Sequence, residues 1–99
     1  MIDVSRDHAV LTIRISGEID LANADELEEV LEDAIDSSVA DTRIELGGVE
    51  YLDSAGVRVL FVLSDRLRTR QIGLQVVAPP GSPARRVLEV AGFPRELWT

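Results

Sequence analysis

Apolar residues in this chain recur at every second position in some segments and at helical spacing in others. The alternation of these two patterns along the chain constrains the fold more than any other feature. From Val10 to Ser16 every second residue faces one way and is apolar, which is typical of a strand with one buried face. Residues 42–46 are also expected to form a strand, a short apolar run at 73–78 predicts another, and residues 2–4 are expected to form an edge strand. Helical spacing of apolar residues appears between and after these strands, at 23–36, 55–70 and 82–92.

The predicted order of elements is therefore β-β-α-β-α-β-α. Strands that alternate with helices imply an α/β fold, with helices packed on a mostly parallel or mixed central sheet. The N-terminal pair is expected to add an antiparallel edge, with Arg6-Asp7-His8 as its turn. With 99 residues and no linker or repeat, the chain is expected to be one domain over residues 1–99. Aromatic residues make up only 4%, so the core must be mostly aliphatic.

Glycines and capping residues predict where several elements begin and end. Gly17–Asp20 and Gly47-Gly48 are expected to break the strands that precede them. Asn23, with a glutamate three residues later, resembles a capping box at the start of the first helix. The last helix is expected to have Ser82 as its N-cap and Gly92 just past its end.

The charge of the chain argues against two classes of partner. Eighteen acidic and ten basic residues give a net charge of −8, and every basic residue is an arginine. Such a surface repels the phosphates of nucleic acid and of an anionic membrane, so neither is expected as a partner. There is no cysteine and no apolar run long enough for a transmembrane helix, and the first residues lack the basic and apolar blocks typical of a signal peptide. We therefore expect a cytoplasmic protein.

The helix expected at 23–36 carries a run of carboxylates on its outer face. They are Asp25, Glu26, Glu28, Glu29, Glu32, Asp33 and Asp36, with no basic residue among them. Carboxylates spread around a helix surface do not converge on one ion, so we interpret this run as a solvated face. No metal or other cofactor is expected.

The second predicted helix has an outer face with unusually little charge. Residues placed about 100° apart form a core stripe of Val57, Leu60, Leu63, Ser64 and Leu67. The opposite side carries Ser54, Arg58, Val62, Asp65 and Thr69, with Phe61 at its edge. Val59 and Val62 lie outside the core stripe. Single exposed apolar residues are normal, but this excess beside Ser54 favours a partner-binding face.

Ser54 follows Asp53 at the point where the strand pattern ends and this helix begins. A serine there can act as a nucleophile, cap the helix or carry a phosphate. A hydrolase nucleophile needs a base, but the only histidine, His8, lies in a predicted turn, and the chain has no lysine. The glycine that stands two residues before the serine of a nucleophile elbow is also missing. The sequence therefore argues against an enzyme.

The two other roles are capping the helix and carrying a phosphate. As an N-cap, Ser54 would stabilise the helix by about 1 kcal/mol, but Asp53 is an equally good cap. A phosphate on Ser54 would place about two negative charges against the helix N-terminus, where the dipole and free N–H groups accept them. Two capping residues in a row suggest more than capping, and a phosphate on Ser54 fits the physical chemistry of this position.

Three stretches, in order along the chain, resemble one known family. Gly17–Ala22 is similar to its Gly-Glu-Leu-Asp stretch before the first long helix, and Tyr51–Gly56 to its Asp-Ser-Ser/Ala-Gly motif. Leu88–Phe93 is similar to the family's ending of a later helix. The family is that of the STAS domains, and the chain most closely resembles the bacterial anti-sigma factor antagonists over nearly its whole length.

This resemblance implies a phosphorylation switch. In that family an anti-sigma factor that is also an ATP-dependent serine kinase phosphorylates the motif serine and is then released, and a separate phosphatase reverses the modification. Carried over by position, Ser54 is the acceptor, supported by Asp53, Asp20 and Gly56. The expected partner-binding residues are Asn23, Ala55, Arg58, Phe61, Val62 and Asp65.

Two other functions compete with this switch. One is an unphosphorylated STAS interaction module of a transporter or stress-signalling complex, which often lacks the motif serine. The other is a receiver phosphorylated on Asp53, which needs a lysine that this chain does not have. We set the receiver aside and keep the interaction module as the alternative.

Arg58 stands where the family often has a small residue, commonly glycine. It follows Ser54 by four residues, one helical turn along, and is within reach of a phosphate there. The sequence allows three roles for Arg58. It can stabilise phosphoserine, bind an acidic group of the partner, or be an ordinary solvated arginine.

Overall fold

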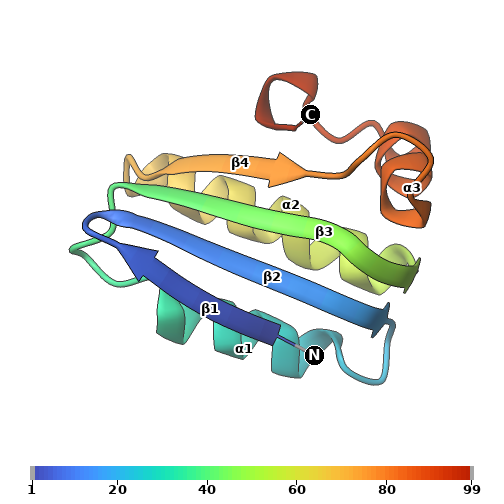
Figure 1. Cartoon of the computed structure of the whole chain (residues 1–99), viewed down its shortest axis with the longest axis horizontal. Helices are drawn as coiled ribbons and strands as arrows, with labels where there is room; N and C mark the ends of the chain where they lie inside the picture. Colours follow the sequence, from blue (N-terminus) through green and yellow to red (C-terminus); the bar gives the residue numbers. More distant parts are fainter. Residues whose placement is uncertain (1, 99) are drawn as a thin grey trace.

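The computed structural model describes residues 2–98, whose arrangement is shown in Figure 1. These residues form four strands, three α-helices and one short 3-10 helix. In chain order they are β1 (Ile2–Asp7), β2 (Val10–Ile19), α1 (Ala24–Ala34), β3 (Asp41–Leu52), α2 (Ser54–Thr69), β4 (Gly73–Val77), α3 (Pro83–Ala91) and the 3-10 helix η1 (Arg95–Leu97). The predicted order of strands and helices is confirmed.

The strands form a mixed sheet in the order β1-β2-β3-β4. β1 is antiparallel to β2, whereas β2, β3 and β4 are parallel to one another, so the predicted α/β class and antiparallel edge are confirmed. Both parallel connections advance by one strand in the same direction, so right-handed crossovers place α1 and α2 on the same face. Figure 1 shows these helices behind the sheet and α3 beside the carboxyl end of β3. The front face of the sheet carries no helix.

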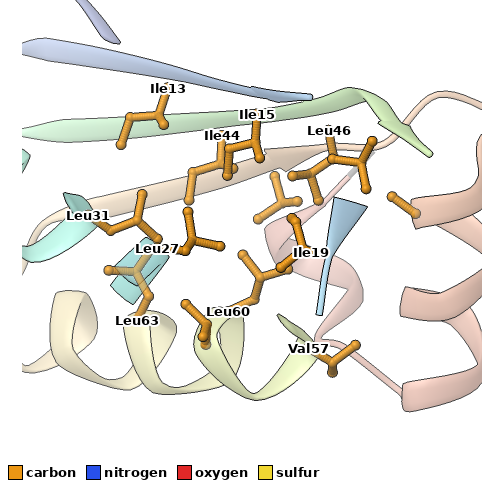
Figure 2. Close-up of a cluster of buried hydrophobic side chains, with 14 of the residues drawn as sticks. Ile13, Ile15, Ile19, Leu27, Leu31, Ile44, Leu46, Val57, Leu60 and Leu63 are labelled. Atoms are coloured by element: carbon orange, nitrogen blue, oxygen red, sulfur yellow. The ribbon is translucent and has the colours of Figure 1, made fainter. Parts of the chain in front are cut away.

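Aliphatic side chains fill the space between the sheet and the two helices. Figure 2 shows this core, which includes Ile13, Ile15, Ile44 and Leu46 from the strands and Leu27, Leu31, Leu60 and Leu63 from the helices. Val59 is also buried, so its predicted place outside the core stripe is wrong. The reason is that α2 contacts α1 and α3 as well as the sheet, which makes its buried sector wider than one stripe.

β3 runs without interruption through Gly47-Gly48, so the predicted strand break there is wrong. The pairing of β2 with β3 shifts on either side of Ser16-Gly17, and at each shift β3 contains one extra residue. These bulges move the buried positions of β3 from 42, 44 and 46 to 49 and 52, so alternation fails although the strand continues. β2 likewise extends to Ile19, through part of the segment predicted as a break.

The predicted N-cap is confirmed for α3, whereas the capping box predicted for α1 is not found. Ser82 caps α3 by accepting a hydrogen bond from the Arg85 amide at 3.3 Å, and Gly92 ends this helix with a left-handed φ of 72°, as predicted. Asn23 occupies the N-cap position of α1, but its side chain makes no capping hydrogen bond. The predicted capping box is therefore wrong, because the Asn23 side chain bonds within the preceding loop instead.

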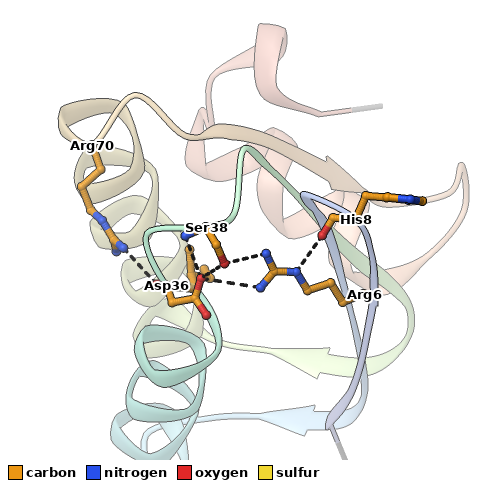
Figure 3. Close-up of polar contacts among 6 residues, drawn as sticks. Arg6, His8, Asp36, Ser38 and Arg70 are labelled. Carbon is orange, nitrogen blue, oxygen red and sulfur yellow. Dashed lines mark hydrogen bonds and ion pairs between the residues drawn. The ribbon is translucent and has the colours of Figure 1, made fainter.

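A polar cluster joins β1 to the segment after α1, at the end of the sheet where β2 and β3 begin (Figure 3). Arg6 lies 3.5 Å from the Asp36 carboxylate and donates hydrogen bonds to the Ser38 hydroxyl at 2.6 Å and the His8 carbonyl oxygen at 2.8 Å. Ser38 donates its hydroxyl and its amide to Asp36. These bonds, together with the charge of Arg6, lower the pKa of the Asp36 carboxyl.

The segment after α3 covers the outer edge of β4. Trp98 forms a parallel bridge with Val76 and donates its indole N–H to the Phe93 carbonyl oxygen at 3.1 Å. The guanidinium groups of Arg85 and Arg95 lie 4.9 and 4.8 Å from the centre of the Trp98 ring, in cation–π contact. This cover protects the β4 edge from pairing with another chain.

Thr42 provides a test of the packing of the core. Its side chain is buried in β3, and its hydroxyl oxygen has no hydrogen-bond partner among residues 2–98. Thr42→Val removes this unpaired group at nearly constant shape, so we expect the free energy of unfolding to rise by about 1 kcal/mol in urea denaturation. Thr12→Val, on the open face of the sheet, is the matched control and should change it by less than about 0.5 kcal/mol. A Thr42→Val protein that is less stable than the parent would contradict this account.

Candidate functional site

The carboxyl ends of β2 and β3 lie side by side, and the segments that follow them form the candidate site. Ile19 pairs with Leu52 at these ends. The loop 20–23 continues from β2 into α1, and Asp53 joins β3 to α2. Binding groups gather at this edge of open α/β sheets because the connecting segments leave the strands there. The two motifs that are distant in the sequence, Gly17–Ala22 and Tyr51–Gly56, meet at this point.

Asp53 ties the two segments together. Its Oδ1 atom accepts hydrogen bonds from the amides of Ala55 at 2.9 Å and Gly56 at 3.2 Å, and so caps α2. Its Oδ2 atom accepts from the Leu21 amide of the neighbouring loop at 3.2 Å. The Asp53 amide donates to the Ile19 carbonyl oxygen at 3.1 Å. The backbone and side chain of this one residue therefore hold the start of α2 against the β2–α1 loop.

The β2–α1 loop is also held by its own polar side chains. The Asp20 carboxylate accepts from the Ala22 amide at 3.0 Å, and the Asp20 amide donates to the Asn23 side-chain oxygen at 3.0 Å. The Asn23 side-chain nitrogen donates to the Glu18 carbonyl oxygen at 2.8 Å. Asp20 was predicted to support the phosphosite and Asn23 to contact a partner. In the structure both residues stabilise the loop whose Leu21 amide is bonded to Asp53.

Gly56 allows the first turn of α2 to pack directly on the strand ends. It is buried, and an added Cβ atom would lie 2.7 Å from the Ile19 side chain and closer still to that of Leu52. A larger residue would push the start of the helix away from the strands, because close-packed interiors have no room to spare. The motif glycine therefore has a packing role in placing the residues before it.

Ser54 is the first residue of α2, and it is exposed. Its hydroxyl has no hydrogen-bond partner among the residues that the structure describes. The interpretation of Ser54 as the cap is wrong, because the junction places Asp53 in that position. His8 lies in the turn before β2, at the opposite end of the sheet, so it cannot act as a base for Ser54.

The predicted partner-binding residues of α2 differ in accessibility. Arg58, Phe61 and Asp65 are exposed, whereas Ala55 and Val62 are half-buried. Phe61 is 37% exposed and packs edge-to-face on Phe93, with ring centroids 5.1 Å apart. Asp65 forms an ion pair with Arg68 at 2.7 Å. Part of this face is therefore engaged within the protein.

Leu21 is a residue of this surface that the sequence patterns do not single out. It is 80% exposed, and its amide is bonded to Asp53, so an apolar side chain stands beside the first turn of α2. The available signal was a leucine directly after Asp20, within a short connection where an apolar residue has no strand or helix face to fill.

The acidic outer face of α1 is partly neutralised by α2. Glu32 accepts a hydrogen bond from Arg66 at 2.6 Å, and this contact raises the pKa of the Arg66 guanidinium. Over residues 2–98, no group of three or more His, Cys, Asp or Glu side chains is arranged to hold a metal ion. Within the same residues no helix is both long and apolar enough to cross a membrane.

Comparison with known proteins identifies the family. The STAS domain family matches residues 1–99 of this chain. The chain belongs to the STAS domain family. Its fold is therefore that of a STAS domain.

Relatives of this STAS domain include proteins named for the control of sigma factors. It is 32% identical over 92 residues to the anti-sigma-F factor antagonist RsfB of Mycobacterium tuberculosis, covering 93% of this chain and 74% of RsfB. The crystal structure of an anti-sigma factor antagonist from Mycobacterium paratuberculosis has a TM-score of 0.86 at 29% identity, covering 98% of this chain and 81% of that one. The unphosphorylated anti-sigma factor antagonist SpoIIAA shares the fold, with a TM-score of 0.82 at 17% identity over 100% of this chain and 86% of its own.

The assignment of the cap leads to a prediction about two adjacent residues of this STAS domain. Asp53→Ala removes the cap of α2 and the bond to the Leu21 amide, so we expect the free energy of unfolding to fall by about 2 kcal/mol in urea denaturation. Ser54→Ala removes no hydrogen bond with the described residues and should change it by less than about 0.5 kcal/mol. Equal losses in the two variants would show that Asp53 is not the principal cap.

Proposed function

We propose that this STAS domain is an anti-sigma factor antagonist that is switched by phosphorylation of Ser54. In this proposal the unphosphorylated protein binds an anti-sigma factor in the cytoplasm and so frees the sigma factor. The anti-sigma factor is also the ATP-dependent serine kinase that modifies Ser54, and a separate phosphatase restores the hydroxyl. The STAS domain is itself regulatory and catalyses no reaction.

The proposed docking surface runs along α2 from Ser54 to Asp65 and includes two residues of the loop before α1. We call it the Ser54 face, and it consists of Leu21, Asn23, Ser54, Ala55, Arg58, Phe61, Val62 and Asp65. It combines one exposed hydroxyl with an exposed leucine, a partly exposed phenylalanine and a cation. Aromatic, aliphatic and arginine side chains of this kind are typical of protein–protein contacts.

The single observation that carries the proposal is the exposed, unbonded hydroxyl of Ser54 beside a helix start that Asp53 already caps. Because the hydroxyl has no structural partner among the described residues, its modification costs the fold little. The backbone that presents it is nevertheless fixed by Asp53 and by the close packing of Gly56. A kinase and a binding partner would therefore meet the same geometry, as expected of a functional residue held on a rigid scaffold.

A phosphate at this position would change the surface more than the fold. It adds about two negative charges next to Asp53, which binds the loop that contains Asp20. A partner whose surface fits the neutral Ser54 hydroxyl and the apolar Leu21 side chain would then have to remove water from the phosphate dianion, which costs free energy. The complex is expected to dissociate because of this charge and bulk, without unfolding of the STAS domain.

The alternative, an unphosphorylated STAS module of a transporter or stress-signalling complex, has less support. Solved transporter structures resemble this chain at 22% identity or below and share only its fold. The relatives near 30% identity that cover most of the chain are named anti-sigma factor antagonists.

Phosphorylation can be tested with purified protein. Incubation with the cognate anti-sigma factor and ATP should add one phosphate, which mass spectrometry should locate on Ser54. Ser54→Ala should stay unmodified and still bind the anti-sigma factor, whereas Ser54→Asp should bind at least about tenfold more weakly because it carries charge into the interface. Ser37→Ala, at an exposed serine outside the Ser54 face, is the matched control and should be phosphorylated normally.

Two results would count against the proposal. The first is the absence of phosphate on Ser54 when the kinase is active on a control substrate. The second is equal binding of Ser54→Ala and Ser54→Asp to the same partner, which would favour the unphosphorylated interaction module.

A further inference from the structure

The three arginines of α2 differ in what they contact. Arg66 is paired with Glu32 of α1 at 2.6 Å, and Arg68 is paired with Asp65 at 2.7 Å. Arg58 is exposed and has no ion pair, hydrogen bond or aromatic contact through its side chain among residues 2–98. The unpaired cation of this helix is therefore the one nearest to Ser54 in the sequence.

Two of the three backbone amides at the start of α2 that could receive a phosphate are already occupied. The amides of Ala55 and Gly56 donate to the Asp53 carboxylate, at 2.9 and 3.2 Å. Of these three amides only that of Ser54 has no partner among residues 2–98, so the first turn keeps one free N–H group for the phosphate. A phosphate on Ser54 that accepts more hydrogen bonds than this one amide can donate must either displace the Asp53 carboxylate or find a cationic side chain.

The charges around Ser54 make the need for a cation stronger. Asp53 precedes it directly, and the Asp20 loop is held beside it through the bond between Leu21 and Asp53. A phosphate dianion would therefore be added to an acidic neighbourhood on a chain whose net charge is already −8. An arginine without a competing carboxylate is the group that would reduce this repulsion.

We propose that Arg58 is the intramolecular receptor of the phosphate on Ser54. Residues four apart face each other on a helix, and a pair with the anion on the N-terminal side also agrees with the helix dipole. The guanidinium can donate two parallel hydrogen bonds to phosphate oxygens. This inference rests on the proposed phosphorylation of Ser54 and names the side chain that stabilises the modified state.

The pair has a consequence for the switch. In the unphosphorylated protein Arg58 is a free cation on the Ser54 face, available to an acidic group of a partner. When the phosphate is present, Arg58 turns toward it and its charge is neutralised. Phosphorylation therefore changes the Ser54 face twice, by adding an anion and by withdrawing a cation.

The experiment uses the full chain with phosphoserine introduced at position 54 by genetic code expansion, so that no kinase is needed. The second pKa of the phosphate is measured by phosphorus NMR in the parent and in Arg58→Ala. We expect the pKa to be about 0.3 unit higher in Arg58→Ala, because an exposed i,i+4 pair stabilises the dianion by this order. Arg58→Lys should give an intermediate value. The Arg58 side-chain Nε–H resonance should also move during the titration of the parent.

Arg68→Ala is the matched control, since it removes an arginine of the same helix that is paired with Asp65. It should leave the phosphate pKa within about 0.1 unit of the parent, because it lies almost four helical turns from Ser54. An unchanged pKa in Arg58→Ala would overturn the proposal. Titration shifts at the Ala55 and Gly56 amides in that case would show that the phosphate had displaced Asp53. Neither result would bear on whether a kinase modifies Ser54, which the preceding experiment decides.

Discussion

The capping of α2 by Asp53 is the interaction on which the rest of the site depends. A helix start leaves several backbone N–H groups without partners, and the Asp53 carboxylate satisfies two of them. The same carboxylate binds the Leu21 amide of another loop. Two segments that are far apart in the sequence are thereby fixed relative to each other at the carboxyl ends of β2 and β3. Gly56 makes this arrangement possible, because any side chain there would collide with the strand ends.

This arrangement separates the structural residue from the residue that is free to change. Asp53 supplies the hydrogen bonds, and Ser54 supplies an exposed hydroxyl with no structural partner among the described residues. If Ser54 were the cap, adding a phosphate would disturb the helix start at the same time as the surface. Arg58 is likewise free to change its contacts, because it takes no part in the ion pairs that Arg66 and Arg68 form. The residues proposed to change the surface, Ser54 and Arg58, therefore lie beside the contacts that stabilise the fold and are not part of them.

Sequence patterns predicted the fold well where the physical cause is local. The alternation at Val10–Ser16, the helical stripe of α2 and the cap at Ser82 follow from side-chain direction and from hydrogen bonds within a few residues. The patterns failed where a distant partner decides the outcome. β3 continues through Gly47-Gly48 because bulges against β2 absorb the extra residues. Likewise, Val59 is buried because helices beside α2 widen its buried sector.

The sequence by itself determined the α/β class, the order of elements, the STAS motifs and the candidate acceptor Ser54, since periodicity and motif spacing are properties of the chain alone. Only the tertiary structure decided which residue caps α2, which amides remain for a phosphate, and which arginine is unpaired. Asp53 and Ser54 are equally good caps by residue type, so the choice depended on where β3 ends and on the Leu21 amide opposite it. The three arginines of α2 are identical as residues, and only the packing of α1 and the geometry of the helix surface show that Arg58 is the one left without a partner among the described residues.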